Sequence, residues 1–235
     1  RGQDMTEVLA ALDTAAAAGC LRAEHFVHVR AEIAVDNTRA LFAPFDGHRL
    51  VRLVSVMDHT PGQRQWRDLG KYRTYYQGKK GLSDEEMERF MARSRELQTR
   101  HAEENRAWFV EYCGRRGIPL ASHDDTTSAH VDRAHAEGMA IAEFPTRVEA
   151  ARRAHELGLS VVMGAPNVVR GGSHSGNVAA TELARLGLLD TLSSDYVPAS
   201  LLVAAAAPMW RTTACPTFAA FRCGCTACRG RRRWA

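Results

Sequence analysis

The sequence predicts an α/β protein in which short parallel strands alternate with helices. Six apolar runs have the length of strands, and most are separated by segments with helical periodicity. This pattern is typical of a (β/α) barrel or a doubly wound sheet. Polar residues follow every run, which favours the barrel, because its loops after the strands form one mouth. With 235 residues, 45% of them hydrophobic, the chain is long enough for one domain of barrel type.

The first part of the chain is predicted to contain one helix and two strands. Residues 4–18 place apolar side chains at helical spacing, and Gly19 is suited to end that helix. Residues 25–33 alternate polar and apolar side chains, as a strand would. Residues 51–57 form a second apolar run. These two runs are the first strands of the expected sheet.

A polar loop and a long helix are expected next. Residues 63–81 are predicted to form a loop with aromatic and basic side chains. Residues 83–115 are predicted to form a charged helix with a solvent-facing surface. The basic side chains of the loop are either an ordinary solvated surface or a lid over a polyphosphate.

The second half of the chain repeats a unit of strand, polar loop and helix. The predicted strands are 118–122, 139–142, 159–163 and 189–192, and the predicted helices are 128–137, 146–157, 178–186 and 198–206. Residues 164–177 between two of these elements are predicted to form a long glycine-rich loop. No internal repeat is evident.

The net charge of +4 comes from the end of the chain. Residues 208–235 contain six arginines, four of the six cysteines and no acidic residue or lysine, so residues 1–207 are mildly acidic. We expect residues 1–207 to form the barrel domain and residues 208–235 to be an atypical Arg/Cys-rich tail, disordered and read from an altered frame. A nucleic-acid patch or half of a zinc site in this tail is poorly supported.

No run approaches the roughly 18 apolar residues of a membrane span. The order of charged, apolar and small residues that marks a secretory signal is also missing. The two cysteines outside the tail fit a reducing compartment. The sequence therefore predicts a cytoplasmic protein that binds neither membranes nor nucleic acid.

Four predicted strand ends carry side chains that ligate metals or transfer protons. These are Glu32, His59, His123 and Asp195. Singly, each is more often a turn residue or a solvated strand end, and Asp125 or Thr126 is expected to cap the following helix. Jointly they favour a divalent metal site, because a barrel directs all its strand ends into one cup. Asp195 would then act as general base on the attacking water.

The loop 164–177 is interpreted as an anion cradle. It contains an arginine, a histidine, asparagines and glycines but no acidic residue, so its backbone N–H groups and side chains can bind negative charge. The alternative is a flexible linker, which glycine and serine also form.

Several long blocks resemble the ribose alkylphosphonate triphosphate diphosphatases of the C–P lyase pathway, in the amidohydrolase superfamily. The blocks are LVSVMDHTPGQRQ (53–65), KYRTYYQGK (71–79), LASHDDTTSAHV (120–131), IAEFPT (141–146) and MGAPNVVRGGSHSGNVAATELARLGLLDTLSSDYVPASLL (163–202). The resemblance runs from about residue 22 to residue 206. It implies a metal-dependent (β/α)₈ barrel that hydrolyses α-D-ribose 1-methylphosphonate 5-triphosphate to the 5-phosphate and diphosphate.

The resemblance also implies roles for individual residues. His123 is similar to the metal histidine of the fifth strand, Asp195 to the catalytic aspartate of the eighth, and Glu32 to a carboxylate ligand of the third. His59 and Glu143 are further metal ligands, for Zn, Mn or Mg. We expect the substrate-binding residues to be Lys71, Tyr72, Asn167, Arg170, Gly171, Gly172, Ser173, His174, Ser175 and Asn177.

The chain departs from the family pattern at both ends. The metal-binding histidine motif of the first strand is missing, so only strands 3–8 of the barrel are expected. Such an incomplete barrel has exposed sheet edges, which favour association into oligomers. The alternative function is therefore an inactive remnant of such an enzyme, from a truncated or frameshifted gene.

Overall fold

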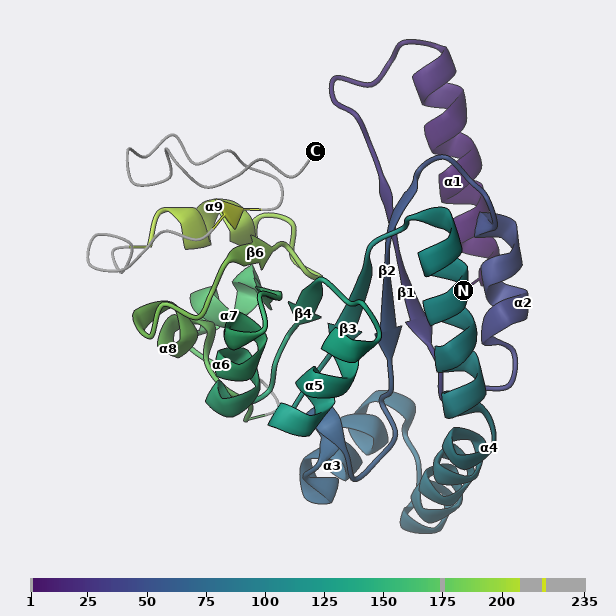
Figure 1. Cartoon of the computed structure of the whole chain (residues 1–235). Coiled ribbons are helices and arrows are strands. Elements are labelled where there is room, and N and C mark those ends of the chain that lie inside the picture. The colour runs from purple at the N-terminus through teal and green to yellow at the C-terminus, as the bar shows by residue number, and fades with distance from the viewer. Residues whose placement is uncertain (1, 174–175, 208–216, 219–235) are drawn as a thin grey trace.

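The structure, a computed structural model, describes residues 2–173, 176–207 and 217–218. Its sheet consists of parallel strands in the order β1-β2-β3-β4-β5-β6-β7, so each strand pairs with the next one along the chain. The strands are β1 (Val27–Glu32), β2 (Val51–Met57), β3 (Leu120–His123), β4 (Ile141–Glu143), β5 (Ser160–Gly164), β6 (Thr191–Ser193) and β7 (Thr217–Phe218). A doubly wound sheet would reverse its strand order. The sequential order is that of a barrel, and the sheet curls into half of one (Figure 1).

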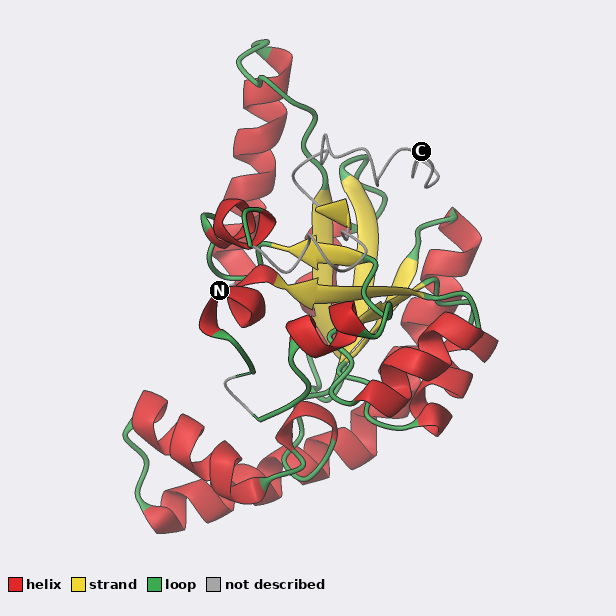
Figure 2. Ribbon diagram, turned by 90° about the vertical axis from the view of Figure 1, so that its left-hand side faces the viewer, coloured by secondary structure: helices red, strands yellow, loops and turns green. Residues whose placement is uncertain are grey.

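Helices surround the curled sheet, most of them on its outside and α3 (Leu69–Lys80) beyond the carboxyl end of β2 (Figures 1 and 2). They are α1 (Gly2–Ala17), α2 (Thr38–Phe42), α3, α4 (Asp84–Arg116), α5 (Ser128–Ala136), α6 (Val148–Glu156), α7 (Ala165–Arg170), α8 (Ala180–Arg185) and α9 (Ser200–Ala205), with single 3₁₀ turns at Ala43–Phe45 and Arg64–Trp66. The core is built from strand residues such as Val54 and Val161, and α6 packs closely through buried alanines. Among the described residues, none of the helices is both long and apolar enough to cross a membrane.

The prediction of a loop at residues 63–81 is wrong, because α3 occupies most of this segment. Asp68 caps the helix by accepting a hydrogen bond from the Lys71 backbone at 3.1 Å, and Gly81 ends it in the left-handed conformation. Trp66 and Tyr72 are buried against two methionines of α4. The helix is therefore stabilised by packing that its polar sequence does not reveal. It lies beyond the carboxyl end of β2 (Figure 1).

The predicted loop 164–177 is also partly helical. Residues Ala165–Arg170 form α7, with Pro166 in the first turn and Gly171 as the left-handed C-cap. The remainder is irregular, and residues 174 and 175 lie outside the described residues. The segment is therefore a short helix followed by a glycine-containing loop.

The expectation for the tail falls mostly outside the described residues. The exception is β7, which pairs with β6 through Thr191 opposite Thr217 and Leu192 opposite Phe218. This short strand is not predicted by the sequence. The predicted disorder of the rest stays a prediction.

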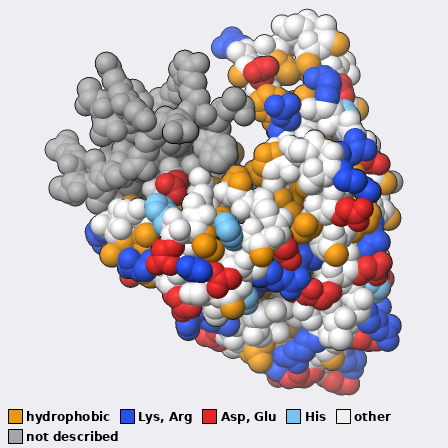
Figure 3. Space-filling model, viewed as in Figure 1, with side chains coloured by type: hydrophobic (Ala, Val, Ile, Leu, Met, Phe, Trp, Pro, Cys, Tyr) orange, Lys and Arg blue, Asp and Glu red, His pale blue; other side chains and the backbone are white. Residues whose placement is uncertain are grey.

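The long helix α4 begins with a capping box formed by Ser83 and Glu86 and ends at Gly117. Ion pairs such as Arg100–Glu96 and Arg115–Glu111 run along its exposed face. Basic and acidic side chains are intermixed on the face of the molecule that Figure 3 shows. The solvent face expected for this helix is confirmed.

A buried ion pair joins α4 to the end of α5. Arg106 is buried and donates from Nε to Glu137 Oε2 at 2.7 Å. Burial would raise the pKa of Glu137, but its hydrogen bonds and charge interactions with Arg106 and Arg133 lower it. A carboxyl group whose pKa is lowered by folding stabilises the fold above its ordinary pKa, and this stabilisation is lost as pH falls.

Replacing Glu137 with glutamine is therefore expected to reduce the free energy of unfolding by about 2 kcal/mol at neutral pH. The difference from wild type should shrink below about pH 4, where the carboxyl group of the unfolded chain is protonated. Urea denaturation of wild type and Glu137→Gln, at neutral pH and below about pH 4, measures the difference in the free energy of unfolding. A difference that does not depend on pH would contradict it.

Candidate active site

Polar side chains gather at the carboxyl ends of the parallel strands. Glu32 and His123 end β1 and β3, and Glu143, the register partner of His123, ends β4. His59 follows β2 by two residues. Because the strands are parallel and adjacent, these ends lie at one edge of the sheet. The convergence predicted from the sequence is present.

Strained backbone marks the same edge. Asp124, Phe144 and Asp195 each follow a strand and have φ values of 55°, 55° and 47°. Non-glycine residues in this left-handed region carry a cost of order 1–3 kcal/mol when the conformation is strained, and they concentrate at functional sites. These three residues turn the chain sharply at the mouth of the half-barrel.

Three side chains form a group that can hold a metal ion. The ligand atoms of His59, His123 and Asp124 all lie within 4.8 Å of one another. Asp124 Oδ2 is 3.6 Å from His59 Nε2 and 3.5 Å from His123 Nε2. This oxygen is buried and has no hydrogen-bond partner among the described residues. A buried carboxylate oxygen without a partner is costly, and a cation between it and the two imidazoles would satisfy it.

Glu32 and Glu143 lie behind the two histidines. Glu32 Oε2 is 2.6 Å from His59 Nδ1, and Glu143 Oε2 is 2.7 Å from His123 Nδ1. Each carboxylate thus holds a ring so that its Nε2 faces Asp124. A carboxylate on the opposite ring nitrogen is the usual outer partner of a metal-binding histidine. This differs from the direct ligand role that the family resemblance implies for both glutamates.

The pKa values agree with this arrangement. Burial would raise the pKa of Glu143, but the hydrogen bond and charge of His123 lower it to about 2. Burial would lower the pKa of His59, but Glu32 and Asp124 more than offset this and raise it. Burial raises the pKa of Asp124. Glu143 therefore stays ionised at neutral pH and accepts the Nδ1–H of His123.

Asp124 is the ligand candidate that the sequence interpretation missed. It directly follows the strand-end His123, but the prediction gave it no role and considered only Asp125 or Thr126, as helix caps. The cap is Thr127, whose hydroxyl accepts from the His130 backbone at 3.3 Å, so the expected cap at Asp125 or Thr126 is wrong. Asp124 could have been identified from the sequence, because it directly follows a histidine at a predicted strand end.

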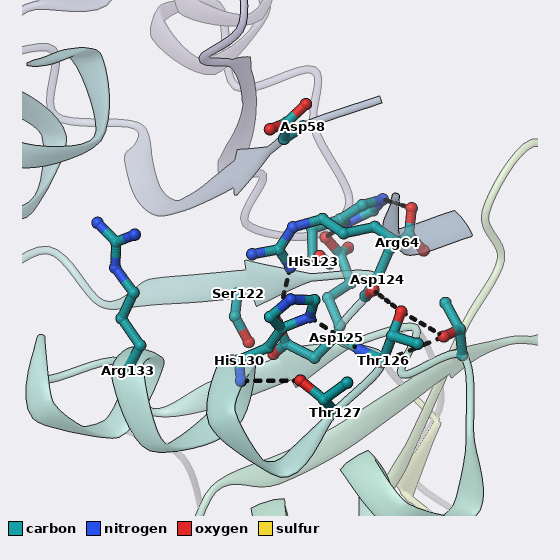
Figure 4. Close-up of polar contacts among 12 residues, drawn as sticks. Asp58, Arg64, Ser122, His123, Asp124, Asp125, Thr126, Thr127, His130 and Arg133 are labelled. Atoms are coloured by element: carbon teal, nitrogen blue, oxygen red, sulfur yellow. Dashed lines mark hydrogen bonds and ion pairs between the residues drawn. The ribbon is translucent and has the colours of Figure 1, made fainter. Parts of the chain in front are cut away.

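Arg64 fixes the strand end that carries His123 and Asp124. Its Nη1 donates to the His123 carbonyl at 2.8 Å and to Asp125 Oδ1 at 2.7 Å. Figure 4 shows Arg64 beside this segment, with Asp58 apart from it. Asp58 instead accepts from the Thr60 backbone at 3.0 Å and so stabilises a turn. Asp125 and Asp58 therefore stabilise the local backbone and are not part of the candidate ligand group.

A cavity of about 1110 Å³ opens beside the candidate metal ligands. His59, His123, Asp124 and Asp195 line it at the strand ends. Of the residues predicted to bind substrate, those that line it are Lys71, Asn167, Arg170, Gly172, Ser173 and Asn177. Gly171 is the C-cap of α7 and Tyr72 is buried elsewhere, so neither lies in the lining. His174 and Ser175 lie outside the described residues.

Basic side chains outnumber acidic ones in the cavity wall. Among the described residues, four basic side chains line it, and the two acidic ones are Asp124 and Asp195. The basic ones are Arg30, Lys71, Lys79 and Arg170. Lys71 and Lys79 come from α3, and Arg170 from α7 donates to the Tyr196 hydroxyl at 3.0 Å. Such a wall attracts a ligand with several negative charges.

Two glycines allow close approach in this wall. A methyl group on Gly164 would lie 3.2 Å from Asp195 Oδ2, so the lack of a side chain lets this carboxylate rest against the end of β5. Gly176 has a φ of 75°, and a side chain there would collide with the Lys71 amine. Lys71 of α3 therefore reaches across to the loop after α7.

The Tyr72 side chain is 2% exposed and contacts Trp66 and Tyr76. We therefore expect Tyr72→Ala to reduce the free energy of unfolding by about 3–5 kcal/mol, as for other buried aromatic side chains. Tyr72→Phe should retain most of the stability and bind inorganic diphosphate as wild type does. Denaturant unfolding and calorimetric titration measure the two effects. Loss of diphosphate binding in a stable Tyr72→Phe protein would restore Tyr72 as a substrate contact.

Comparison with known proteins supports the predicted relationship. No family model and no solved structure matches the chain. A curated protein of Escherichia coli (strain K12), alpha-D-ribose 1-methylphosphonate 5-triphosphate diphosphatase, is 50% identical over 205 residues, which cover 87% of this chain. The chain is a homologue of this diphosphatase. It spans about half of the diphosphatase's length, 54%. The sequence resemblance is thus confirmed.

Proposed function

We propose that the cavity hydrolyses α-D-ribose 1-methylphosphonate 5-triphosphate to the 5-phosphate and diphosphate, as part of phosphonate catabolism. The observation that carries the proposal is the shared cavity, in which the candidate metal group, Asp195 and four basic side chains meet. A triphosphate needs compensating positive charge, and the hydrolysis of its anhydride bond needs an activated water. The homologous diphosphatase supports this substrate over other polyphosphates.

His59, His123 and Asp124 would hold the divalent ion. Two imidazoles and one carboxylate suit Zn²⁺ or Mn²⁺ better than Mg²⁺, which prefers oxygen ligands. When bound, such an ion supplies Lewis acidity and a nucleophile near neutral pH. Glu32 and Glu143 would orient the imidazoles through their Nδ1 atoms.

Asp195 would accept the proton of the attacking water. It lies at the cavity wall after β6, held in a left-handed backbone conformation. As the water oxygen bonds to phosphorus, the phosphoanhydride bond breaks and diphosphate leaves with the bonding electron pair. The carboxylate takes the released proton, which is the general-base role expected of such a residue.

The basic residues of α3 and α7 would bind the phosphate chain. Lys71 and Lys79 of α3 and Arg170 of α7 lie in the cavity wall. Their charges would neutralise the diphosphate as it leaves, while Asn167 supports the loop by accepting a hydrogen bond from the Ala180 backbone at 2.8 Å. This assigns the terminal phosphates to the side of the cavity that α3 and α7 form.

The products of the reaction test the proposal. We expect ³¹P NMR of the triphosphate substrate with this chain and Mn²⁺ or Zn²⁺ to show one diphosphate and one 5-phosphate per turnover, and no reaction after chelation. Orthophosphate as the first product would contradict the assigned reaction. Ion binding without any turnover would favour the inactive remnant.

A further inference from the structure

Arg30 occupies the space between the candidate metal group and the candidate base. It lies on β1 between His28 and Glu32, and these alternate residues face the inside of the half-barrel. Its Nη2 is 3.1 Å from His123 Nε2, and its Nη1 is 4.0 Å from Asp195 Oδ1. One guanidinium group therefore reaches both halves of the proposed reaction centre.

Neighbouring strands hold the Arg30 side chain in place. Its Nε donates to Met57 Sδ at 3.3 Å, and its guanidinium lies 5.7 Å from the centre of the Phe144 ring. Met57 ends β2, and Phe144 follows β4 in the left-handed conformation. Residues at the ends of β2 and β4 thus position the guanidinium group of Arg30, which lines the cavity.

The Arg30 guanidinium has only a long ion pair with a carboxylate, at 4.0 Å to Asp195 Oδ1. Among the described residues, its guanidinium donates no hydrogen bond to an acidic side chain, whereas Arg64 bonds Asp125 at 2.7 Å and Arg106 bonds Glu137 at 2.7 Å. Arginine has five N–H donors, and Arg30 uses two of them in hydrogen bonds to the part of the chain that the structure describes. With 40% of the side chain exposed, the other donors can bind an anion in the cavity.

We propose that Arg30 contacts the phosphoryl group under attack and stabilises the charge that develops on its non-bridging oxygens. This inference rests on the proposed function. A planar guanidinium suits two phosphoryl oxygens at once. Arg30 keeps its protons throughout: the water proton goes to Asp195, and the bonding electron pair goes to diphosphate.

The contact with His123 is compatible with this role. A cation held by His123 would use the same Nε2 atom, so the Nη2 group would be released from it and become available to a phosphoryl oxygen. Removing the guanidinium should then leave the affinity for the ion unchanged or higher. A purely structural arginine would instead support the ion site, and its loss would weaken ion binding.

The test compares Arg30→Ala and Arg30→Lys with a matched control on the neighbouring strand. Arg52 of β2 is exposed and stacks on Phe26 outside the cavity, so Arg52→Ala should behave as wild type. Arginines that stabilise phosphoryl transfer contribute about 10³- to 10⁵-fold to the rate. We expect kcat of Arg30→Ala to fall by at least about 10³-fold, with Mn²⁺ affinity by calorimetry no weaker than that of wild type.

Chemical rescue separates a phosphoryl contact from a structural role. Millimolar guanidinium chloride should restore part of the activity of Arg30→Ala in a saturable way and leave Arg52→Ala unaffected. Arg30→Lys should recover only part of the rate, because an ammonium group cannot bridge two oxygens in the same plane. If Arg30→Ala does not fold, kcat and KM of Arg30→Lys are measured instead. We then expect a lower kcat and an unchanged KM.

The outcomes distinguish this inference from the proposed function. An active wild type together with Arg30→Ala within about tenfold of its kcat, or with Arg30→Lys at the wild-type kcat, overturns the role of Arg30 alone. Weaker Mn²⁺ binding by Arg30→Ala, without rescue by guanidinium, also overturns it in favour of a structural role. A wild-type chain that releases no diphosphate overturns the proposed function and the role of Arg30 with it.

Discussion

Asp195→Asn is expected to reduce kcat for diphosphate release by about 100- to 10,000-fold, the range that a positioned general base contributes. Asparagine keeps the shape of the side chain but cannot take the proton of the attacking water. The affinity for Mn²⁺ should change little, because Asp195 is not among the three residues of the candidate metal group. Rates of diphosphate release and calorimetric titration with Mn²⁺ measure the two quantities separately.

Asp132→Asn is a suitable control for this substitution. Asp132 lies on α5 outside the cavity and pairs with Arg153 at 2.6 Å. Its loss should leave kcat unchanged. If Asp195→Asn retains wild-type kcat, Asp195 is not the base, whatever its position at the strand end.

The second large effect is expected for the metal group. Replacing Asp124 with asparagine removes one of the three candidate ligands and should weaken Zn²⁺ or Mn²⁺ binding by more than 100-fold. The outer carboxylates should have smaller effects: Glu32→Gln and Glu143→Gln are each expected to weaken binding by about 10- to 100-fold. Calorimetric titration of each variant after chelation measures this graded series. The rise in thermal unfolding midpoint with added ion should decrease in the same order.

His135→Asn is the matched control, because His135 is an exposed histidine on α5 outside the cavity. It should bind the ion as wild type does. Equal losses for Glu143→Gln and Asp124→Asn would make Glu143 a direct ligand, as the family resemblance implies. No loss in any of these variants would place the ion elsewhere.

The strands were predictable because burial dictates their composition. Val51–Met57 and Ser160–Gly164 are apolar runs of the right length, and the polar residues after them mark the mouth of the half-barrel. The helix α3 was not predictable from periodicity. Its stability comes from Trp66 and Tyr72 packing on α4, which involves residues distant in sequence.

The site was predictable in outline but not in its division of roles. Residues His59, His123 and Asp195 stand at strand ends, so topology alone brings them together. Glu143 could bind an ion directly or hold the ring of His123. The two arrangements differ by a shift of the carboxylate about as long as a hydrogen bond, and no sequence pattern encodes such a shift. Arg30 was missed for a related reason: the alternation of β1 shows two faces but does not show which one lines the cavity.

We propose that one ion, held by His59, His123 and Asp124, sustains hydrolysis in this cavity. The most direct measurement titrates Mn²⁺ into the chelated chain while recording bound ion and diphosphate release together. We predict that the rate rises in proportion to the occupancy of a single tight site, and that Asp124→Asn loses both signals together. Diphosphate release that persists at zero occupancy, or that Asp124→Asn retains in full, would contradict the claim.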